Sequence, residues 1–282
     1  MKILVTLDAE RYSRNIIKDV ARLAQNTLAD IVFLGIRENS DEPMESLAKA
    51  LLEYHWYLCG SFSDEDSPYQ EIDDGEWQKK DADTWELTSR GMKEFRLEIR
   101  TGSAVQHTLA MAAEVGSDLI ILGCSQRYGC EWQGEMNVPL RLVRDAPCSV
   151  LVIKQVKKVE QIVSILDQSV VSQQALELVN QLVTLHDAGL KIVGVKEKRS
   201  RKTDKIEKTM VELLKYYNER KLNAWIKLIN GDEVRDYVTF SSREGIVALW
   251  MGGKESLLKK IFSRSLADKL LETTDSSLLI LR

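Results

Sequence analysis

The sequence has few of the features that mark a secreted, membrane or nucleic-acid-binding protein. No apolar run in its 282 residues is long enough to span a bilayer. Its first strand-like segment leads directly into a charged segment, 8–14, unlike a secretory signal. The formal net charge is −4 and no basic stripe is present. We therefore expect a cytoplasmic protein that binds neither nucleic acid nor membrane.

One local basic run is the exception, and we interpret it as a solvated loop after a strand. Its members are Lys196, Lys198, Arg199, Arg201 and Lys202.

Patterns typical of catalysis or metal binding are also scarce. The chain has only four cysteines and three histidines, and none has a metal-binding spacing. We therefore predict no metal ligands. Cys124 and Cys130 share one loop and could form a redox pair, but nothing in the sequence indicates an activated thiol. We interpret them as ordinary thiols. A Walker phosphate loop is absent, and no catalytic residue is predicted.

What the sequence does contain is an internal duplication. Three glycines of the first half recur in the second half with their spacings kept; the pairs are Gly102 and Gly231, Gly116 and Gly245, and Gly123 and Gly252. An opening segment, 2–8, is echoed by 161–167, and a closing segment, 149–154, by 277–282. A repeat of this length indicates a duplicated domain. We predict domains at 1–155 and 156–282.

Each half alternates apolar strands with amphipathic helices, which predicts an α/β fold. The expected strands are 3–7, 31–36, 95–99, 119–122 and 150–153, then 162–166, 191–195, 224–228, 246–250 and 278–281. Helical crossovers between such apolar strands favour two doubly wound domains, each with a mainly parallel five-stranded sheet flanked by helices. We expect Ser103 to cap a helix that ends at Gly116 in the left-handed conformation.

The first half also carries an insertion at about 39–94. It begins with a helix-like stretch, 44–57, and continues as an acidic tract, 63–83, with tryptophans 56, 77 and 85 in or beside it. Grouped carboxylates could hold Ca²⁺, but the spacing of a calcium loop is absent. We interpret the insertion as a lid or a partner-contacting loop.

The strand ends suggest a ligand site in each half. Asp8 and Asp167 follow the first strand of their halves, and Gly123 and Gly252 follow the fourth. In an open parallel sheet, ligands bind at the carboxyl ends of the strands where the strand order reverses. A carboxylate there can hydrogen-bond a ribose or base, and a glycine loop before a helix can hold phosphate.

These features, found twice in one order, resemble the universal stress protein family in tandem form, with UspA-like domains. The resemblance rests on strands that end in aspartate, on Gly102 and Gly231, on the segments 118–123 and 247–252, and on the closing segment 146–154. It implies the adenine nucleotide α-hydrolase-like fold, dimer-like pairing of the domains and a role in stress adaptation. Some members of the family bind ATP or AMP.

Nucleotide-binding members carry a glycine, two residues, a glycine, nine residues and then Gly-Ser or Gly-Thr. After Gly123, the first half has Gln126 and Met136-Asn137 at the later positions. The second half keeps more of the motif, so ATP or AMP is predicted there. Its candidate residues are Asp167, Gly252, Gly253, Lys254, Ser263 and Ser265, and the weaker candidates in the first half are Asp8 and Gly123.

We therefore predict a non-enzymatic regulatory or binding protein of the stress-response type. It would act through protein partners or self-association, with its two domains paired to each other. One alternative is a small-molecule binder with a cleft roofed by the insertion. The other is a nucleotide-hydrolysing or adenylyl-transferring enzyme, but that class needs a glycine-containing phosphate loop after strand one, and 8–13 has no glycine.

Overall fold

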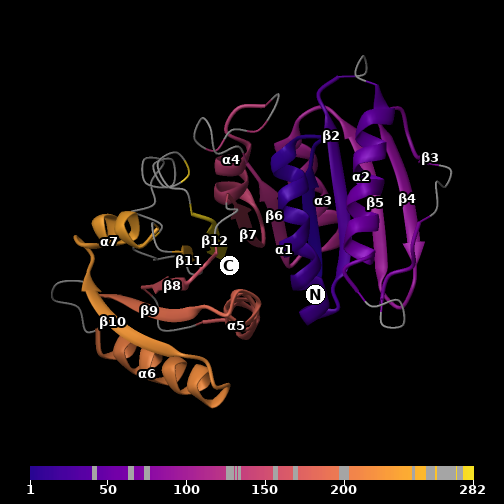
Figure 1. Ribbon diagram of the computed structural model, residues 1–282. Coiled ribbons are helices and arrows are strands. Elements are labelled where there is room, and N and C mark those ends of the chain that lie inside the picture. Colours follow the sequence, from indigo (N-terminus) through magenta and orange to yellow (C-terminus); the bar gives the residue numbers. More distant parts are fainter. Residues whose placement is uncertain are drawn as a thin grey trace. The chain divides into compact units, whose positions relative to one another are not determined.

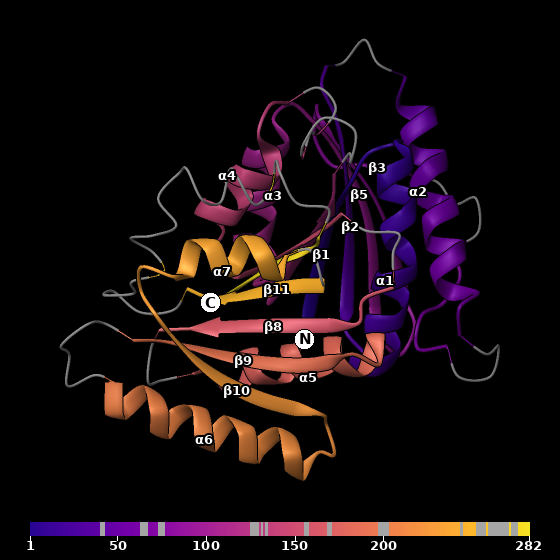
Figure 2. The same cartoon turned by 60° about the vertical axis from the view of Figure 1, so that its left-hand side comes forward.

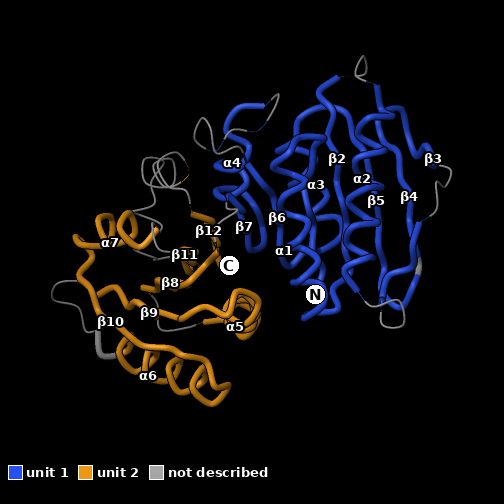
Figure 3. Tube along the Cα trace, viewed as in Figure 1, with its two compact units in different colours: residues 1–154 blue, residues 155–282 orange. Residues whose placement is uncertain are grey.

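The computed structural model divides into two compact units, residues 1–154 and 155–282 (Figure 3). It describes residues 1–39, 43–62, 67–72, 77–124, 130, 132, 135–154, 158–167, 171–196, 203–242, 245–251, 258, 271 and 276–282. No helix in these ranges combines the length and apolar character needed to cross a bilayer. Each unit is an α/β layer structure and is described by itself.

Unit 1 is built on five parallel strands in the order β5-β2-β1-β6-β7. These are β1 (Lys2–Leu7), β2 (Asp30–Arg37), β5 (Glu94–Thr101), β6 (Leu119–Gly123) and β7 (Ser149–Ile153). The strands are almost wholly buried, as their continuous apolar sequences predict. The strand order reverses at β1, which pairs with β2 on one side and β6 on the other. The carboxyl end of β1 is therefore a switch point of the kind that binds ligands.

Four helices cover both faces of this sheet (Figures 1 and 2). They are α1 (Arg11–Thr27), α2 (Met44–Cys59), α3 (Ala104–Val115) and α4 (Val138–Asp145). Helix α1 packs beside α2, and α3 packs beside α4. The predicted caps of α3 are confirmed: Ser103 Oγ accepts the Gln106 N–H, and Gly116 ends the helix at φ 64°.

The predicted insertion is largely an ordinary part of the sheet architecture. Its helical stretch is α2, the crossover between the parallel neighbours β2 and β5. Beyond it, β4 (Thr84–Arg90) pairs antiparallel with β5, and the short β3 (Gln78–Lys79) pairs with β4. The described part of the insertion therefore extends the sheet of unit 1 instead of forming a separate loop. The acidic segments 63–66 and 73–76 lie outside the described residues.

A buried histidine joins α2 to the chain that follows it. His55 Nε2 accepts a hydrogen bond from the Ile72 N–H at 3.1 Å, and the Gln70 backbone also bonds to the ring. The ring packs against Phe95 of β5, with centroids 4.4 Å apart. Burial lowers the pKa of His55 to about 4, so the imidazole is neutral near pH 7. Trp56, the next residue, donates from its indole to the Ile72 carbonyl.

Unit 2 repeats the strand order of unit 1, as β10-β9-β8-β11-β12, with all neighbours parallel. The strands are β8 (Gln161–Leu166), β9 (Gly189–Lys196), β10 (Ala224–Asn230), β11 (Gly245–Trp250) and β12 (Leu278–Leu281). The helices among its described residues are α5 (Gln173–His186), α6 (Thr203–Glu219) and α7 (Val234–Ser241). Within 257–271 only Leu258 and Leu271 are described, and the basic run lies outside the described residues after Lys196.

The repeated glycines have different structural reasons in the two units. Gly116 is left-handed at a helix end, whereas a Cβ on its counterpart Gly245 would lie 1.8 Å from the Gln161 carbonyl oxygen. Gly102 has φ 125°, a region that favours glycine, and a Cβ on its counterpart Gly231 would meet its nearest neighbour only at 3.9 Å. A shared residue type in the repeat is therefore not evidence of a shared local role.

Candidate functional site

The structure brings Asp8 and Gly123 together at the switch point of unit 1. Asp8 directly follows β1, and Gly123 ends the neighbouring β6, with Thr6 paired to Leu122. The equivalent aspartate of unit 2, Asp167, directly follows β8, which pairs with β11. The prediction that Asp8 and Gly123 lie at the same edge of the sheet is thus confirmed for unit 1.

The carboxylate of Asp8 is already engaged by its own chain. Ser13 Oγ donates to Oδ1 at 2.6 Å, the Glu10 N–H donates to the same oxygen at 3.0 Å, and the Tyr12 hydroxyl donates to Oδ2. Asp8 is only 7% exposed. Burial raises the pKa of Asp8, and the hydrogen bonds from Ser13 and Tyr12 oppose that rise. The first turn of α1 thus occupies the oxygens that a ribose hydroxyl would need.

Aromatic side chains surround this carboxylate. The Trp132 ring, 6% exposed, packs on the Tyr12 ring with centroids 5.8 Å apart. From α2, the Tyr54 hydroxyl donates to the Asp8 carbonyl oxygen at 3.3 Å. Burial, followed by the charge of Asp8, raises the pKa of Tyr54 to about 12, so its phenol stays protonated. Two tyrosines and a tryptophan therefore fill the neighbourhood of Asp8.

Gly123 serves helix packing in unit 1. A Cβ at this position would lie 2.9 Å from the Tyr12 carbonyl oxygen and 3.0 Å from Ile16 Cγ2. Contacts this short force the neighbouring groups to move, and here one of them is backbone. The glycine thus lets the first turns of α1 rest directly on the end of β6, which in turn holds Tyr12 over Asp8.

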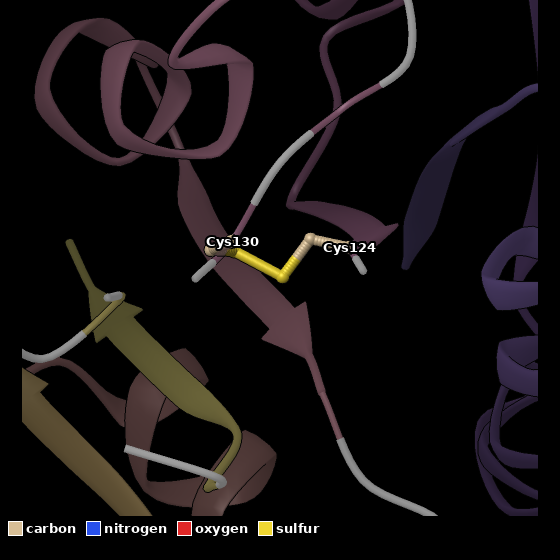
Figure 4. Close-up of a disulfide and its surroundings, with 2 residues drawn as sticks. All are labelled: Cys124 and Cys130. Carbon is tan, nitrogen blue, oxygen red and sulfur yellow. A yellow bond between two sulfur atoms is a disulfide. The ribbon is translucent and has the colours of Figure 1, made fainter. Parts of the chain in front are cut away.

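Cys124 and Cys130 form a disulfide, so the interpretation of both as ordinary thiols is wrong. Their Cα atoms are 5.1 Å apart, and the bridge lies just beyond the end of β6 (Figure 4). This separation lies within the range that a disulfide can bridge. A spacing of six residues carries no such signal in the sequence. Cys59 and Cys148 take no part in a disulfide.

Glu135 is a second residue that sequence reasoning missed. Its carboxylate accepts hydrogen bonds from Ser103 Oγ at 3.0 Å and from the Val105 N–H at 3.3 Å, at the first turn of α3. Arg141 of α4 donates to the same carboxylate. An acidic side chain at a helix N-terminus is stabilising, and this one ties the chain after β6 to α3. Met136, at a glycine position of the phosphate motif, is instead 83% exposed.

In unit 2 the strand-end aspartate meets the chain that follows β11. Asp167 Oδ2 accepts the Leu258 N–H at 2.7 Å. Counted from the aspartate, the position of Tyr12 is held here by Val171, which has no hydroxyl. The other candidates, Gly252, Gly253, Lys254, Ser263 and Ser265, lie outside the described residues. A backbone amide of the predicted phosphate-binding segment is thus one polar partner of Asp167.

A sequence model of the universal stress protein family matches residues 1–154, more than half of the chain. The chain belongs to the universal stress protein family. No curated protein sequence matches it. Among solved structures, a universal stress protein from Archaeoglobus fulgidus DSM 4304 is 10% identical with a TM-score of 0.60, over 100% of this chain and 96% of that one. A functionally unknown protein from Pseudomonas aeruginosa PAO1 is 15% identical with a TM-score of 0.59, over 99% and 92%.

These likenesses confirm the fold class that the sequence predicts for this universal stress protein. Across the described residues, no group of three or more His, Cys, Asp or Glu side chains is arranged to hold a metal ion. At identities this low, the solved structures bear on the fold alone. What the protein binds has to be argued from its own residues.

Proposed function

We propose that this universal stress protein is a non-enzymatic regulatory binding protein in which the second unit binds ATP or AMP and the first unit is a scaffold. One observation supports this difference between the two units. Tyr12, Ser13 and the Glu10 N–H take up the carboxylate of Asp8, whereas valine stands at the Tyr12 position in unit 2. A nucleotide in unit 1 would have to displace three internal hydrogen bonds and the Trp132 contact. In unit 2 no phenol can compete from that position.

The residues proposed for the nucleotide are those that the family motif predicts. Asp167 would accept a hydrogen bond from the ribose or base, at the carboxyl end of β8. Gly252 and Gly253 would allow backbone N–H groups to approach the phosphates, with Lys254 supplying positive charge. Ser263 and Ser265 would supply hydroxyl donors. The hydrogen bond from the Leu258 amide to Asp167 supports this assignment, because it ties that segment to the aspartate.

Two histidine environments favour binding over catalysis. His55 is buried and bonded to the backbone at Ile72 and Gln70. His107 Nε2 lies 3.0 Å from the Thr101 carbonyl oxygen. Each ring therefore serves the structure of unit 1 at sites remote in sequence from the proposed nucleotide residues. We propose that nucleotide binding modulates self-association or contacts with protein partners, as in a regulatory protein.

The contacts around Asp8 argue against a small-molecule site under the insertion. Tyr54 of α2 does reach the Asp8 carbonyl oxygen, as a roof over this edge would require. However, Tyr12 and Trp132 already fill the neighbourhood of the Asp8 carboxylate.

The repeated strand order supports assigning unit 2 as a second domain of the same kind, with predicted limits of 156–282.

Native mass spectrometry of the full chain with added ATP or AMP tests the proposal. We expect one nucleotide per chain. Asp167→Asn should weaken binding by roughly tenfold, as for the loss of a hydrogen bond worth about 1.4 kcal/mol. The matched variant Asp8→Asn should leave affinity unchanged. No binding at millimolar nucleotide would refute the proposal, and a loss confined to Asp8→Asn would move the site to unit 1.

A further inference from the structure

The two halves of the Cys124–Cys130 disulfide differ in accessibility. Cys124 is 2% exposed and directly follows β6, whereas Cys130 is partly exposed. The bridge joins residues only six apart. A loop this short restricts the unfolded chain less than a long loop does, so the bridge adds less to stability than a long-range disulfide would. The position of the bridge and the unequal exposure of its two cysteines are better explained by a role in thiol–disulfide exchange than by a role in stability.

Both ends of the bridge lead to the residues that surround Asp8. Cys124 follows Gly123, on which the Tyr12 backbone rests. Cys130 lies two residues before Trp132, whose ring packs on Tyr12. Tyr12 in turn donates to Asp8. A change at the bridge therefore has a short physical route to the aromatic contacts at the carboxyl end of β1.

We propose that Cys124 and Cys130 form a reversible thiol–disulfide site that exchanges with small thiols and disulfides. Oxidation or reduction of this site changes the contact between Trp132 and Tyr12. The partly exposed Cys130 is the sulfur that meets the external reagent, and the buried Cys124 is the resolving sulfur. This inference rests on unit 1 alone and is independent of nucleotide binding in unit 2.

The exchange balances with a small disulfide such as oxidised glutathione as the oxidant. The Cys130 thiolate attacks one sulfur of the reagent, which forms a mixed disulfide and releases one small thiolate. The Cys124 thiolate then attacks Cys130 Sγ, forms the internal bridge and releases the second small thiolate. Two electrons pass from the protein to the reagent, and the two protons lost by the cysteines end on the two small thiols. Reduction is the reverse sequence.

The first test is a redox titration of the full chain in glutathione buffers of graded composition. Thiols are trapped by alkylation and counted for each cysteine by peptide mass. We expect residues 124 and 130 to pass together from mainly bridged to mainly reduced across the series, and Cys148→Ser to titrate identically. A bridge intact at every ratio would make it purely structural, and thiols that stay reduced in excess oxidised glutathione would also overturn the proposal.

Single-cysteine variants test the assigned roles. Cys124→Ser should accumulate glutathione on Cys130, whereas Cys130→Ser should be modified at Cys124 at least about tenfold more slowly, because access to the attacking thiol controls the rate. Equal rates would contradict the asymmetry. Reduction should also change the tryptophan fluorescence, and Trp132→Phe should remove that change while keeping the redox titration. A full fluorescence response without Trp132 would refute the link to Tyr12.

Discussion

The Tyr12 hydroxyl donates a hydrogen bond to Oδ2 of Asp8, four residues earlier in the chain. This contact turns the strand-end aspartate of unit 1 from a prospective ligand group into part of the fold. It depends on the close approach of α1 to Gly123, which holds the Tyr12 backbone in place. The strand-end sites of the two units therefore differ in one residue, Tyr12 in unit 1 and Val171 in unit 2.

Removal of this phenol should destabilise unit 1 in a pH-dependent way. We expect Tyr12→Phe to lower the free energy of unfolding by about 2 kcal/mol at pH 7, since the lost bond is made to a charged carboxylate. The loss should shrink at low pH, where Asp8 is protonated and the bond is between neutral groups. Urea unfolding at a series of pH values measures both effects. The control Tyr57→Phe changes an exposed tyrosine and should have little effect. Equal losses at all pH values would contradict the role assigned to Asp8.

A side chain at position 123 should push α1 away from β6. We expect Gly123→Ala to lower the free energy of unfolding by about 1–3 kcal/mol, because the added Cβ meets the Tyr12 carbonyl oxygen and Ile16 at overly short distances. Gly231→Ala is the matched control, since its Cβ would have its nearest neighbour at 3.9 Å. Urea midpoints of the two variants should differ clearly. If Gly123→Ala is as stable as the control, the glycine is not a packing residue.

His55 should make unit 1 sensitive to acid. Its folded-state pKa of about 4 lies below the ordinary value of 6.5, so protonation favours the unfolded chain. The stabilising contribution is complete above pH 6.5 and is lost as the pH falls toward 4, by on the order of 3 kcal/mol at most. His55→Gln should unfold more easily at neutral pH and show a flatter pH dependence in this window. His186→Gln keeps His55 and should retain the slope. A slope unchanged in His55→Gln would refute this assignment.

The sequence predicts the scaffold well because its signals are local or follow from general sheet geometry. Continuous apolar strands predict a parallel sheet, and the carboxyl ends of neighbouring strands then bring Asp8 beside Gly123. The left-handed glycine at 116 and the Ser103 cap follow from helix-end chemistry. The β3–β4 extension was missed, although an alternating run from Thr84, followed by Gly91, is a hairpin signal.

The chemistry around Asp8 was harder to predict because it depends on tertiary approach. Whether Tyr12 points at Asp8 depends on how deeply α1 rests on Gly123. The cysteine pairing depends on a Cα separation that spacing alone does not fix. Glu135 bonds to Ser103, at the start of α3, although the two residues are 32 positions apart in the sequence. These contacts join distant segments, and no local pattern of residue types encodes them.

The central claim is that nucleotide binds to the second unit and not to the first. Photolabelling of the full-length protein with 8-azido-ATP tests it most directly, with the labelled peptides identified by mass spectrometry. The account predicts label within residues 155–282 that is lost when unlabelled ATP competes. Label within residues 1–154 that ATP displaces, or no displaceable label in either unit, would contradict it.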